Sequence, residues 1–283
     1  MTIAFLGTGL LGSGFVHGFL KRGTPVTAWN RTAAKTAPLI EAGAKVAATP
    51  AEAVRGASRV HLCLSADDAV DEVLAAIADA VGAGVVIVDH STTSPEGTAE
   101  RATRLAARAQ PFLHAPVFMS PGAAKAALGM MLCAGPAELH AQVEADLRAM
   151  TGELWYLGDD LRRAAALKLL GNAMLIAIAA GVADTLTVGA AMGVVPRQAY
   201  ELLARLKPGG AIDVRGKRMA EGDFAATFEL TMARKDLGLM LDAAGDRPLA
   251  TLRAIAGRAD ELIARGLGGS DLGVLATDAV TKP

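Results

Sequence analysis

The sequence predicts an α/β fold, in which a doubly wound parallel sheet is followed by an all-α domain entered through one long helix. Two observations predict it. In the first half of the chain, short apolar runs typical of buried strands alternate with stretches of helical periodicity. After residue 158 the strand pattern stops, and one uninterrupted helical run opens the second half. At 283 residues the chain is long enough for two domains, which we expect at 1–158 and 159–283.

The elements follow from these apolar runs and from the Gly and Pro residues between them. Strands are expected at residues 3–6, 25–29, 45–47, 59–64, 85–89, 110–115, 130–134 and 154–157. Helices are expected in the first half near residues 10–22, 33–42, 50–56, 67–81, 95–108 and 137–150. In the second half, Asp159 or Asp160 can cap the long helix, which continues to Gly193. Shorter helices are expected after it near residues 197–206, 213–220, 229–243 and 248–266.

Three glycines stand between the first predicted strand and the first predicted helix, in the stretch GTGLLG. Small residues at a strand-to-helix turn let the backbone approach a pyrophosphate at the helix N-terminus. The alternative is a tight turn of the kind that any α/β domain uses. The position between strand and helix favours a dinucleotide site, with contacts from Gly7, Gly9, Leu10, Leu11 and Gly12.

The end of the second strand indicates which dinucleotide is bound. Folds that bind NAD usually place Asp or Glu about 20 residues beyond the glycines, where it accepts a hydrogen bond from the ribose 2′-hydroxyl. Here that position holds Asn30, and Arg31 follows. A guanidinium binds the 2′-phosphate that a carboxylate would repel, and Thr32 and Lys35 lie close by in the sequence. The sequence therefore predicts NADP as the cofactor, with a solvated Arg31 at the start of a helix as the alternative.

The composition excludes several other classes of protein. With a net charge of −1 and scattered basic residues, no general attraction to nucleic acid or to an anionic membrane is expected. Cys63 and Cys133 lie in apolar stretches, which indicates core positions and a reducing, cytoplasmic compartment. The N-terminus leads directly into the first strand and leaves no room for a signal peptide. Residues 173–193 are nearly all apolar but contain Asp184, so we expect a buried helix of a soluble protein instead of a membrane span. None of the histidines has a metal-ligand spacing, and no metal is expected.

Polar residues follow two further strands at the edge where ligands of open α/β sheets bind. The hydroxyls after the fifth strand either meet the nicotinamide ribose or cap the next helix. These hydroxyls include those of Ser91 and Thr92. The cluster of residues 64–68 (Leu-Ser-Ala-Asp-Asp) ends the fourth strand, and we expect it to form a loop beside the cofactor, which includes Leu64 and Ser65, and to cap the following helix.

The long helix carries the residue with the clearest chemical meaning. Lys168 and Asn172 lie one turn apart on the same face, and their neighbours are almost all apolar. A Lys in such surroundings is unfavourable unless it is paired, lies in a cleft or has a lowered pKa. Hydride transfer to a carbonyl needs a proton donor for the developing alkoxide, which a buried Lys can supply. The alternative is a Lys that extends to solvent from a half-buried helix.

Near the C-terminus, Lys235 and Asp236 interrupt an apolar helical run that follows Phe228. They either close over the cofactor from the second domain or form an ordinary exposed pair.

Ordered motifs over nearly the whole chain resemble those of the β-hydroxyacid dehydrogenase family, which includes 3-hydroxyisobutyrate dehydrogenases and glyoxylate or succinic semialdehyde reductases and is related to imine reductases. The matching stretches are GTGLLG, WNRT, DHSTTSP, APV, KLLGN and FEL followed by KDL. The resemblance implies a Rossmann domain, an all-helical domain and a cleft between them. It also implies Lys168 as the catalytic acid/base, Asn172 in the substrate site, and Thr92 and Lys235 near the cofactor.

One loop departs from the family pattern. The family commonly has Ser-Gly-Gly after APV, where backbone amides hold a substrate carboxylate. Here bulky apolar residues replace the glycines, and Pro121 removes one amide donor, which favours a larger or less polar substrate. The substrate site is expected to include Phe118, Met119 and Ser120, together with Ser91, Phe228 and Asp236.

The expected function is NADP-dependent hydride transfer at the carbonyl or alcohol carbon of a small β-hydroxy acid or semialdehyde. Imine reductases usually carry Asp or Tyr where this chain has Lys168, so the lysine favours a carbonyl over an imine. An NADPH-dependent imine reductase and a non-catalytic dinucleotide-binding protein are the alternatives. Because the long helix is apolar around most of its circumference, we expect a homodimer that packs around residues 175–193.

Overall fold

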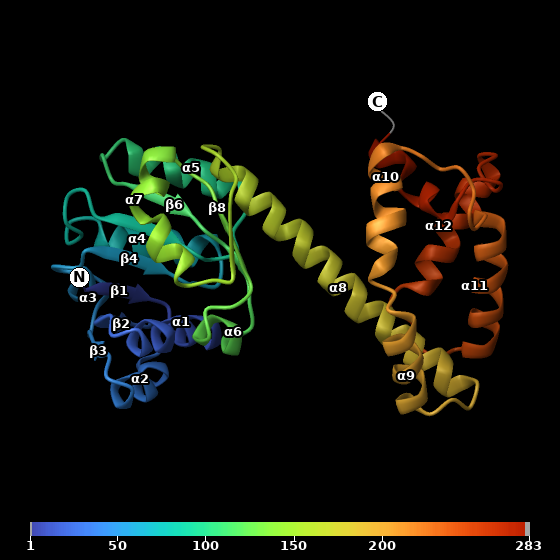
Figure 1. The fold of residues 1–283 in the computed structure, drawn as a ribbon, viewed down its shortest axis with the longest axis horizontal. Helices are drawn as coiled ribbons and strands as arrows, with labels where there is room; N and C mark the ends of the chain where they lie inside the picture. The colour runs from blue at the N-terminus through green and yellow to red at the C-terminus, as the bar shows by residue number, and fades with distance from the viewer. Residues whose placement is uncertain (1, 281–283) are drawn as a thin grey trace. The chain divides into compact units, whose positions relative to one another are not determined.

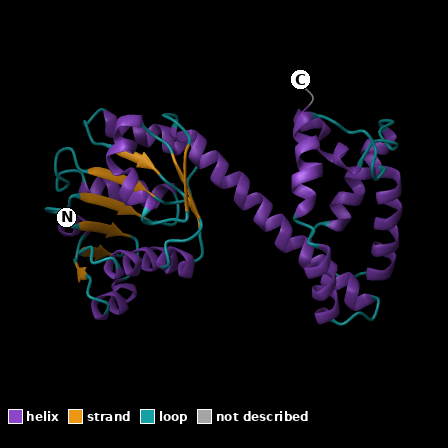
Figure 2. Ribbon diagram, viewed as in Figure 1, coloured by secondary structure: helices purple, strands orange, loops and turns teal. Residues whose placement is uncertain are grey.

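The computed structural model describes residues 2–280 and consists of two compact units (Figure 1). The first unit extends to Asn172 and the second begins at Ala173, so the long helix contributes residues to both. Strands occur in the first unit, whereas the described part of the second unit is helical (Figure 2). The predicted fold class is therefore confirmed. The domain boundary expected at residue 158 stays a prediction.

The first unit is built on a six-stranded parallel sheet with the order β3-β2-β1-β4-β5-β6. The strands are β1 (Ile3–Leu6), β2 (Val26–Trp29), β3 (Lys45–Val46), β4 (Arg59–Leu62), β5 (Val86–Asp89) and β6 (Phe112–His114). Every residue of β1, β4 and β5 is buried, as expected for parallel strands that are covered on both faces.

Helices cover both faces of this sheet (Figure 1). They are α1 (Leu10–Lys21), η1 (Ala33–Thr36), α2 (Ala37–Glu41), α3 (Pro50–Val54), α4 (Asp67–Ile77) and α5 (Pro95–Ala106). Side chains alternate along a strand, so Phe5 of β1 enters a core with Phe15 of α1, whereas Leu6 enters the opposite core with Val70 of α4. The two cores fix the sheet between its helices and leave the carboxyl ends of the strands for loops.

A second, three-stranded sheet corrects the expectation of one continuous sheet. Its order is β7 (Val117–Phe118), β8 (Met130–Cys133) and β9 (Glu153–Tyr156), with β7 antiparallel to β8. One isolated bridge, His114 to Ala134, connects the two sheets. The strand runs at 130–134 and 154–157 were correctly placed, but a local pattern does not reveal which strand is its partner.

The loop expected between residues 114 and 122 contains β7 and leads into a short helix, α6 (Pro121–Lys125). Ser120 caps α6, because its Oγ accepts a hydrogen bond of 3.1 Å from the backbone amide of Ala123. Pro121 at the first helical position needs no amide partner there. Helix α7 (Ala137–Arg148) precedes β9.

Helix α8 (Leu161–Ala191) is the long helix, and Asp160 caps it with a hydrogen bond of 3.1 Å from the amide of Arg162 to Oδ1. Among the described residues, α8 is the one helix long and apolar enough to cross a membrane, judged by length and composition alone. Only 6% of its most apolar window is buried within the single chain, so most of its apolar side chains are left uncovered there. An apolar helix with this exposure needs a further partner.

The second unit continues with helices separated by short loops. They are α9 (Pro196–Leu206), the π-helical turn η2 (Ile212–Gly216), α10 (Lys217–Glu221), α11 (Leu230–Ala244), α12 (Leu252–Ala264), η3 (Leu272–Ala276) and α13 (Thr277–Val280). Two buried carboxylates organise them. Asp184 of α8 accepts hydrogen bonds from the amides of Ala250, Thr251 and Leu252, which delays the start of α12 beyond the expected residue 248. Asp271 caps η3, an element that the sequence pattern missed.

Candidate functional site

The glycine turn after β1 has the geometry of a phosphate-binding loop. Gly7 has φ +97°, and a Cβ on it would lie 2.3 Å from the carbonyl oxygen of Cys63. A Cβ on Gly12 would lie 2.0 Å from the carbonyl oxygen of Gly7. A Cβ on Gly9 would meet nothing within 4 Å, so this backbone faces open space. The first and third glycines are thus required by packing, and the second leaves room for a ligand beside the start of α1.

A cavity of about 420 Å³ opens at this turn. Residues that follow β1, β2, β4 and β5 line it, so it lies at the carboxyl ends of parallel strands, where open α/β sheets bind ligands. It brings together every residue of the first unit that the sequence analysis placed at the cofactor, namely Gly7, Gly9, Leu10, Leu11, Gly12, Asn30, Arg31, Thr32, Lys35, Leu64, Ser65 and Thr92, as well as Ser91. Glu72 of α4 also lines this cavity, and no sequence motif had indicated it as a site residue.

Asn30 holds the glycine turn and the next loop together. Its Oδ1 accepts a hydrogen bond of 3.0 Å from the Thr8 amide, and its Nδ2 donates one of 3.0 Å to the Thr32 carbonyl. Arg31, by contrast, is 74% exposed, and its nearest carboxylate is Glu72 at 3.7 Å. Because an exposed pair of this length is weak, the Arg31 guanidinium remains available to an anion.

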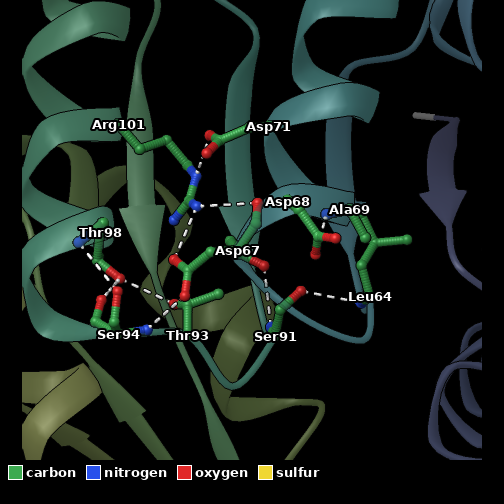
Figure 3. A network of polar contacts seen from close by, with 12 residues as sticks. Leu64, Asp67, Asp68, Ala69, Asp71, Ser91, Thr93, Ser94, Thr98 and Arg101 are labelled. Atoms are coloured by element: carbon green, nitrogen blue, oxygen red, sulfur yellow. Dashed lines mark hydrogen bonds and ion pairs between the residues drawn. The ribbon is translucent and has the colours of Figure 1, made fainter.

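A network of polar contacts fixes two of the loops that line the cavity, the one after β4 and the one after β5 (Figure 3). Ser91 Oγ accepts a hydrogen bond of 2.9 Å from the amide of Leu64, which ties the loop after β5 to the loop after β4. Asp67 Oδ2 accepts one of 2.9 Å from the amide of Ser94 and joins the same loops a second time. Ser94 Oγ accepts from the amide of Gly97 and caps α5, so this hydroxyl serves the helix.

Arg101 of α5 completes the network, and its side chain is fully buried. Its Nη2 lies 3.0 Å from Asp67 Oδ1 and its Nε 2.9 Å from Asp71 Oδ1 (Figure 3). Burial raises the pKa of the Asp67 carboxyl, but the hydrogen bonds from Ser94 and Arg101 outweigh it and leave this pKa below its ordinary value. The expectation that residues 64–68 supply a side-chain cap for α4 is wrong, since the N-cap residue is Ala66 and no side chain caps this helix.

A second candidate site in the first unit is formed by Lys168 of α8 and its hydrogen-bond partner Asn172. The side chain of Lys168 is buried, with 8% of the residue exposed, and Nζ donates a hydrogen bond of 2.8 Å to Asn172 Oδ1. Among the described residues no carboxylate lies within 4 Å of Nζ. Burial lowers the pKa of the ammonium below its ordinary value. The pairing of Lys168 with Asn172 that their spacing predicts is present.

Phe118 of β7 covers this lysine. Nζ of Lys168 lies 4.0 Å from the centroid of the Phe118 ring, a cation–π contact. The ring also packs on the helix backbone, because a Cβ on Gly171 would lie 2.3 Å from Cζ of Phe118. Met119 packs against the core of the first unit, and Ser120 caps α6. No sequence motif indicates the contact between Phe118 and Gly171.

Three of the expected site residues belong to the second unit. The amide of Phe228 donates a hydrogen bond of 3.0 Å to Asp271 Oδ2, which fixes the start of α11. Lys235 Nζ lies 2.9 Å from Asp236 Oδ1, and both side chains are exposed. Their roles toward the cofactor and the substrate stay predictions.

Two further expectations concern metals and cysteines. The described residues contain no group of three or more His, Cys, Asp or Glu side chains that could hold a metal ion. Cys133 is buried, and Cys63 is half-buried against the same core. Burial raises the pKa of both thiols to about 12, so neither is a thiolate near neutral pH.

Two family models together match most of the chain. Residues 2–158 match the NAD binding domain of 6-phosphogluconate dehydrogenase, and residues 163–275 match the model described as the NAD-binding domain of NADP-dependent 3-hydroxyisobutyrate dehydrogenase. Since α8 carries the beginning of the second match, it is a core helix of this enzyme fold and not a membrane span.

Curated proteins and solved structures agree with these matches. The chain is 30% identical over 260 residues to the uncharacterized oxidoreductase YfjR of Bacillus subtilis, covering 89% of this chain and 91% of YfjR. It is also 30% identical over 248 residues to the cytokine-like nuclear factor N-PAC of Homo sapiens, of which it spans 44%. A reductive aminase from Aspergillus terreus in complex with NADPH and ethyl-5-oxohexanoate has a TM-score of 0.89 at 27% identity, over 98% of this chain and 99% of that one. An imine reductase from Myxococcus stipitatus in complex with NADP+ has a TM-score of 0.91 at 22% identity over the full length of both chains, which shows the shared fold.

The resemblance found in the sequence is therefore confirmed, and the cavity at the glycine turn fits a nicotinamide dinucleotide. The chain belongs to the family of NAD(P)-dependent oxidoreductases that join a 6-phosphogluconate dehydrogenase-type NAD-binding domain to a 3-hydroxyisobutyrate dehydrogenase-type C-terminal domain.

Proposed function

We propose that the chain is an NADP-dependent oxidoreductase that interconverts a carbonyl and an alcohol, with Lys168 as the general acid/base. The observation that carries the proposal is the state of Lys168, which is buried, lacks a carboxylate partner among the described residues and is held by one amide oxygen. When hydride reaches a carbonyl carbon, the oxygen gains negative charge and needs a proton. An ammonium whose pKa is lowered by burial donates that proton more readily than an exposed lysine.

Asn172 acts as a positioning residue in this scheme. Its Oδ1 accepts a hydrogen bond from Nζ of Lys168 and so limits the directions in which the ammonium can point. An amide oxygen is neutral, so it orients the lysine without raising its pKa as a carboxylate would. The proton on Nζ therefore stays available for the substrate oxygen.

The cavity at the glycine turn supports the binding of NADP(H), which supplies or accepts the hydride. The open backbone at Gly9 leaves space for the pyrophosphate, and the exposed guanidinium of Arg31 suits a 2′-phosphate. Thr32 and Lys35 line the same cavity and add a hydroxyl and a second cation. We infer a preference for NADP(H) over NAD(H) from these groups.

The surroundings of Lys168 favour an apolar substrate. Phe118 covers the lysine, and Met119 and Pro121 stand where related enzymes commonly present glycine amides to a carboxylate. We therefore rank aldehydes and ketones with an apolar substituent above semialdehydes and β-hydroxy acids, because both of the latter carry a carboxylate.

The second candidate is an NADPH-dependent imine reductase. It is favoured by the similarity to a reductive aminase at 27% identity along nearly the whole chain. Reduction of an imine also needs a proton, in this case on nitrogen, and Lys168 can supply it. Lys168 can therefore serve as the proton donor in either reaction, and the two candidate functions differ in which substrate, a carbonyl or an imine, is turned over faster.

The test is a steady-state survey with NADPH. Aldehydes, ketones, semialdehydes, cyclic imines and ketone–amine mixtures are compared by kcat/KM, and 3-hydroxy acids are tested with NADP+. We expect the largest kcat/KM for a carbonyl compound. Faster turnover of a preformed cyclic imine than of every carbonyl would establish the second candidate instead. Tight NADPH binding without turnover of any compound would indicate a non-catalytic dinucleotide-binding protein.

A further inference from the structure

A carboxylate lies in the cofactor cavity beside the arginine that we expect to bind the 2′-phosphate. Glu72 of α4 lines the cavity together with Arg31, and its Oε2 is 3.7 Å from Nη1 of Arg31. The two side chains are 71% and 74% exposed, so they hold each other only weakly. Among the described residues that line this cavity, Glu72 is the one acidic side chain, opposite the two cations Arg31 and Lys35.

We propose that Glu72 is a specificity-determining residue. Its carboxylate counteracts the attraction of Arg31 for the 2′-phosphate and so lowers the ratio of NADPH affinity to NADH affinity. This inference rests on the proposed preference for NADP(H). A phosphate that binds Arg31 brings up to two negative charges close to Glu72, because Arg31 already contacts Glu72. Like charges this near repel, since the Debye length at physiological salt is about 8 Å.

The same carboxylate has the opposite effect on NADH. The 2′-hydroxyl of NADH carries no charge and can donate a hydrogen bond to a carboxylate oxygen. Glu72 therefore supplies, from α4, the acidic group that is missing from the end of β2, where Asn30 instead ties the glycine turn to the next loop. The cavity thus combines a group suited to each dinucleotide, and the balance between Arg31 and Glu72 sets the preference.

The experiment measures the dissociation constants of NADPH and NADH by isothermal titration calorimetry at one fixed ionic strength. Wild type, Glu72→Gln and Arg31→Gln are compared with Glu100→Gln. Glu100 is an exposed carboxylate of α5 outside the cavity, so its variant makes the same change in net charge. We expect Glu72→Gln to raise the ratio of NADPH affinity to NADH affinity by about three- to fivefold, the effect of one exposed charge pair. The increase shrinks at high salt, whereas Glu100→Gln keeps the wild-type ratio.

Two outcomes separate this inference from the proposed cofactor preference. If Arg31→Gln lowers the ratio but Glu72→Gln matches Glu100→Gln, the role of Glu72 is overturned and the preference for NADP(H) stands. If Arg31→Gln leaves the ratio unchanged, the preference through Arg31 is wrong, and the role of Glu72 as its opponent falls with it.

Discussion

Nζ of Lys168 lies 4.0 Å from the centre of the Phe118 ring, so the proton donor that we propose is covered by an aromatic face. The ring attracts the cation, whereas burial disfavours it. The pKa of Lys168 is lowered, so burial outweighs the contacts that stabilise the charged form. Phe118 therefore contributes to the burial that lowers this pKa, while the face of its ring stabilises the charged form of the lysine.

Replacing Lys168 tests its chemical role. Lys168→Ala is expected to lower kcat by about 100-fold or more, the scale of a lost acid/base. Lys168→Arg should not restore activity, because a guanidinium does not release its proton near neutral pH. The affinity for NADPH should stay unchanged in both variants, since Lys168 is not among the residues that line the cofactor cavity. Steady-state kinetics and calorimetry check these outcomes, and a near wild-type kcat in Lys168→Ala would make the lysine structural.

The pH dependence of the two reaction directions follows from the proposed role of Lys168, and its lowered pKa sets the pH range. Reduction needs the protonated lysine, so kcat/KM for reduction should fall as pH rises through a pKa below the ordinary value of 10.5. Oxidation needs the neutral amine, so its rate should rise over the same pH range. Both limbs should vanish in Lys168→Ala when its residual activity is measured. Limbs that persist in the variant would assign this pKa to another group.

The contact between Phe118 and Gly171 allows a double-mutant test. Gly171→Ala places a Cβ 2.3 Å from Cζ of Phe118, so the ring has to move, with an expected destabilisation of about 1–3 kcal/mol. In a Phe118→Ala background the same change meets no ring and should be neutral or stabilising, because Ala favours a helix by about 1 kcal/mol over Gly. Chemical denaturation of the four proteins measures this coupling. Equal effects of Gly171→Ala in both backgrounds would contradict the contact.

The sequence predicted those parts of the site that depend on local chemistry. The glycine turn and the polar end of β2 can be read from neighbouring residues, and the spacing of Lys168 and Asn172 places them on one helix face. The remaining features depend on contacts between distant segments. Arg101 reaches Asp67 across 34 residues, and nothing near either residue marks the other as its partner. In the same way, the pairing of β8 with β7 and β9 follows from tertiary structure and not from the strand pattern.

Arg101 is expected to stabilise the two loops that flank the cavity. Arg101→Met removes the buried guanidinium that Asp67 and Asp71 share, which should cost about 1–3 kcal/mol, less than for a fully buried pair, because both carboxylates are more than one-third exposed. NADPH affinity should fall as well, since Asp67 joins the loop after β4 to the loop after β5. Arg104→Met is the matched control, because Arg104 contacts the same Asp71 but is 55% exposed. Thermal unfolding and calorimetry compare the two, and equal losses would contradict a special role for Arg101.

The exposed apolar surface of α8 predicts a homodimer. Large side chains along its middle are strongly exposed in the single chain, including Leu175 at 57% and Ile176 at 69%. A helix that is apolar on most sides is stable in water only when something covers it. Asp184 of the same helix accepts hydrogen bonds from three backbone amides of the segment before and at the start of α12. This buried polar contact is typical of a helix that packs within protein, so we expect a second copy of the chain, and not lipid, to cover α8. Light scattering at micromolar concentration should give twice the chain mass of 28.9 kDa.

A charge on this surface should dissociate the dimer. Ile176→Glu places a carboxylate in the expected interface, where burial of an unpaired charge is strongly unfavourable. Ile40→Glu on α2 is the matched control, since Ile40 is also exposed but lies outside residues 175–193. The first variant should shift toward 28.9 kDa, whereas the second keeps the mass of the wild type. A wild-type mass of one chain would reject the dimer.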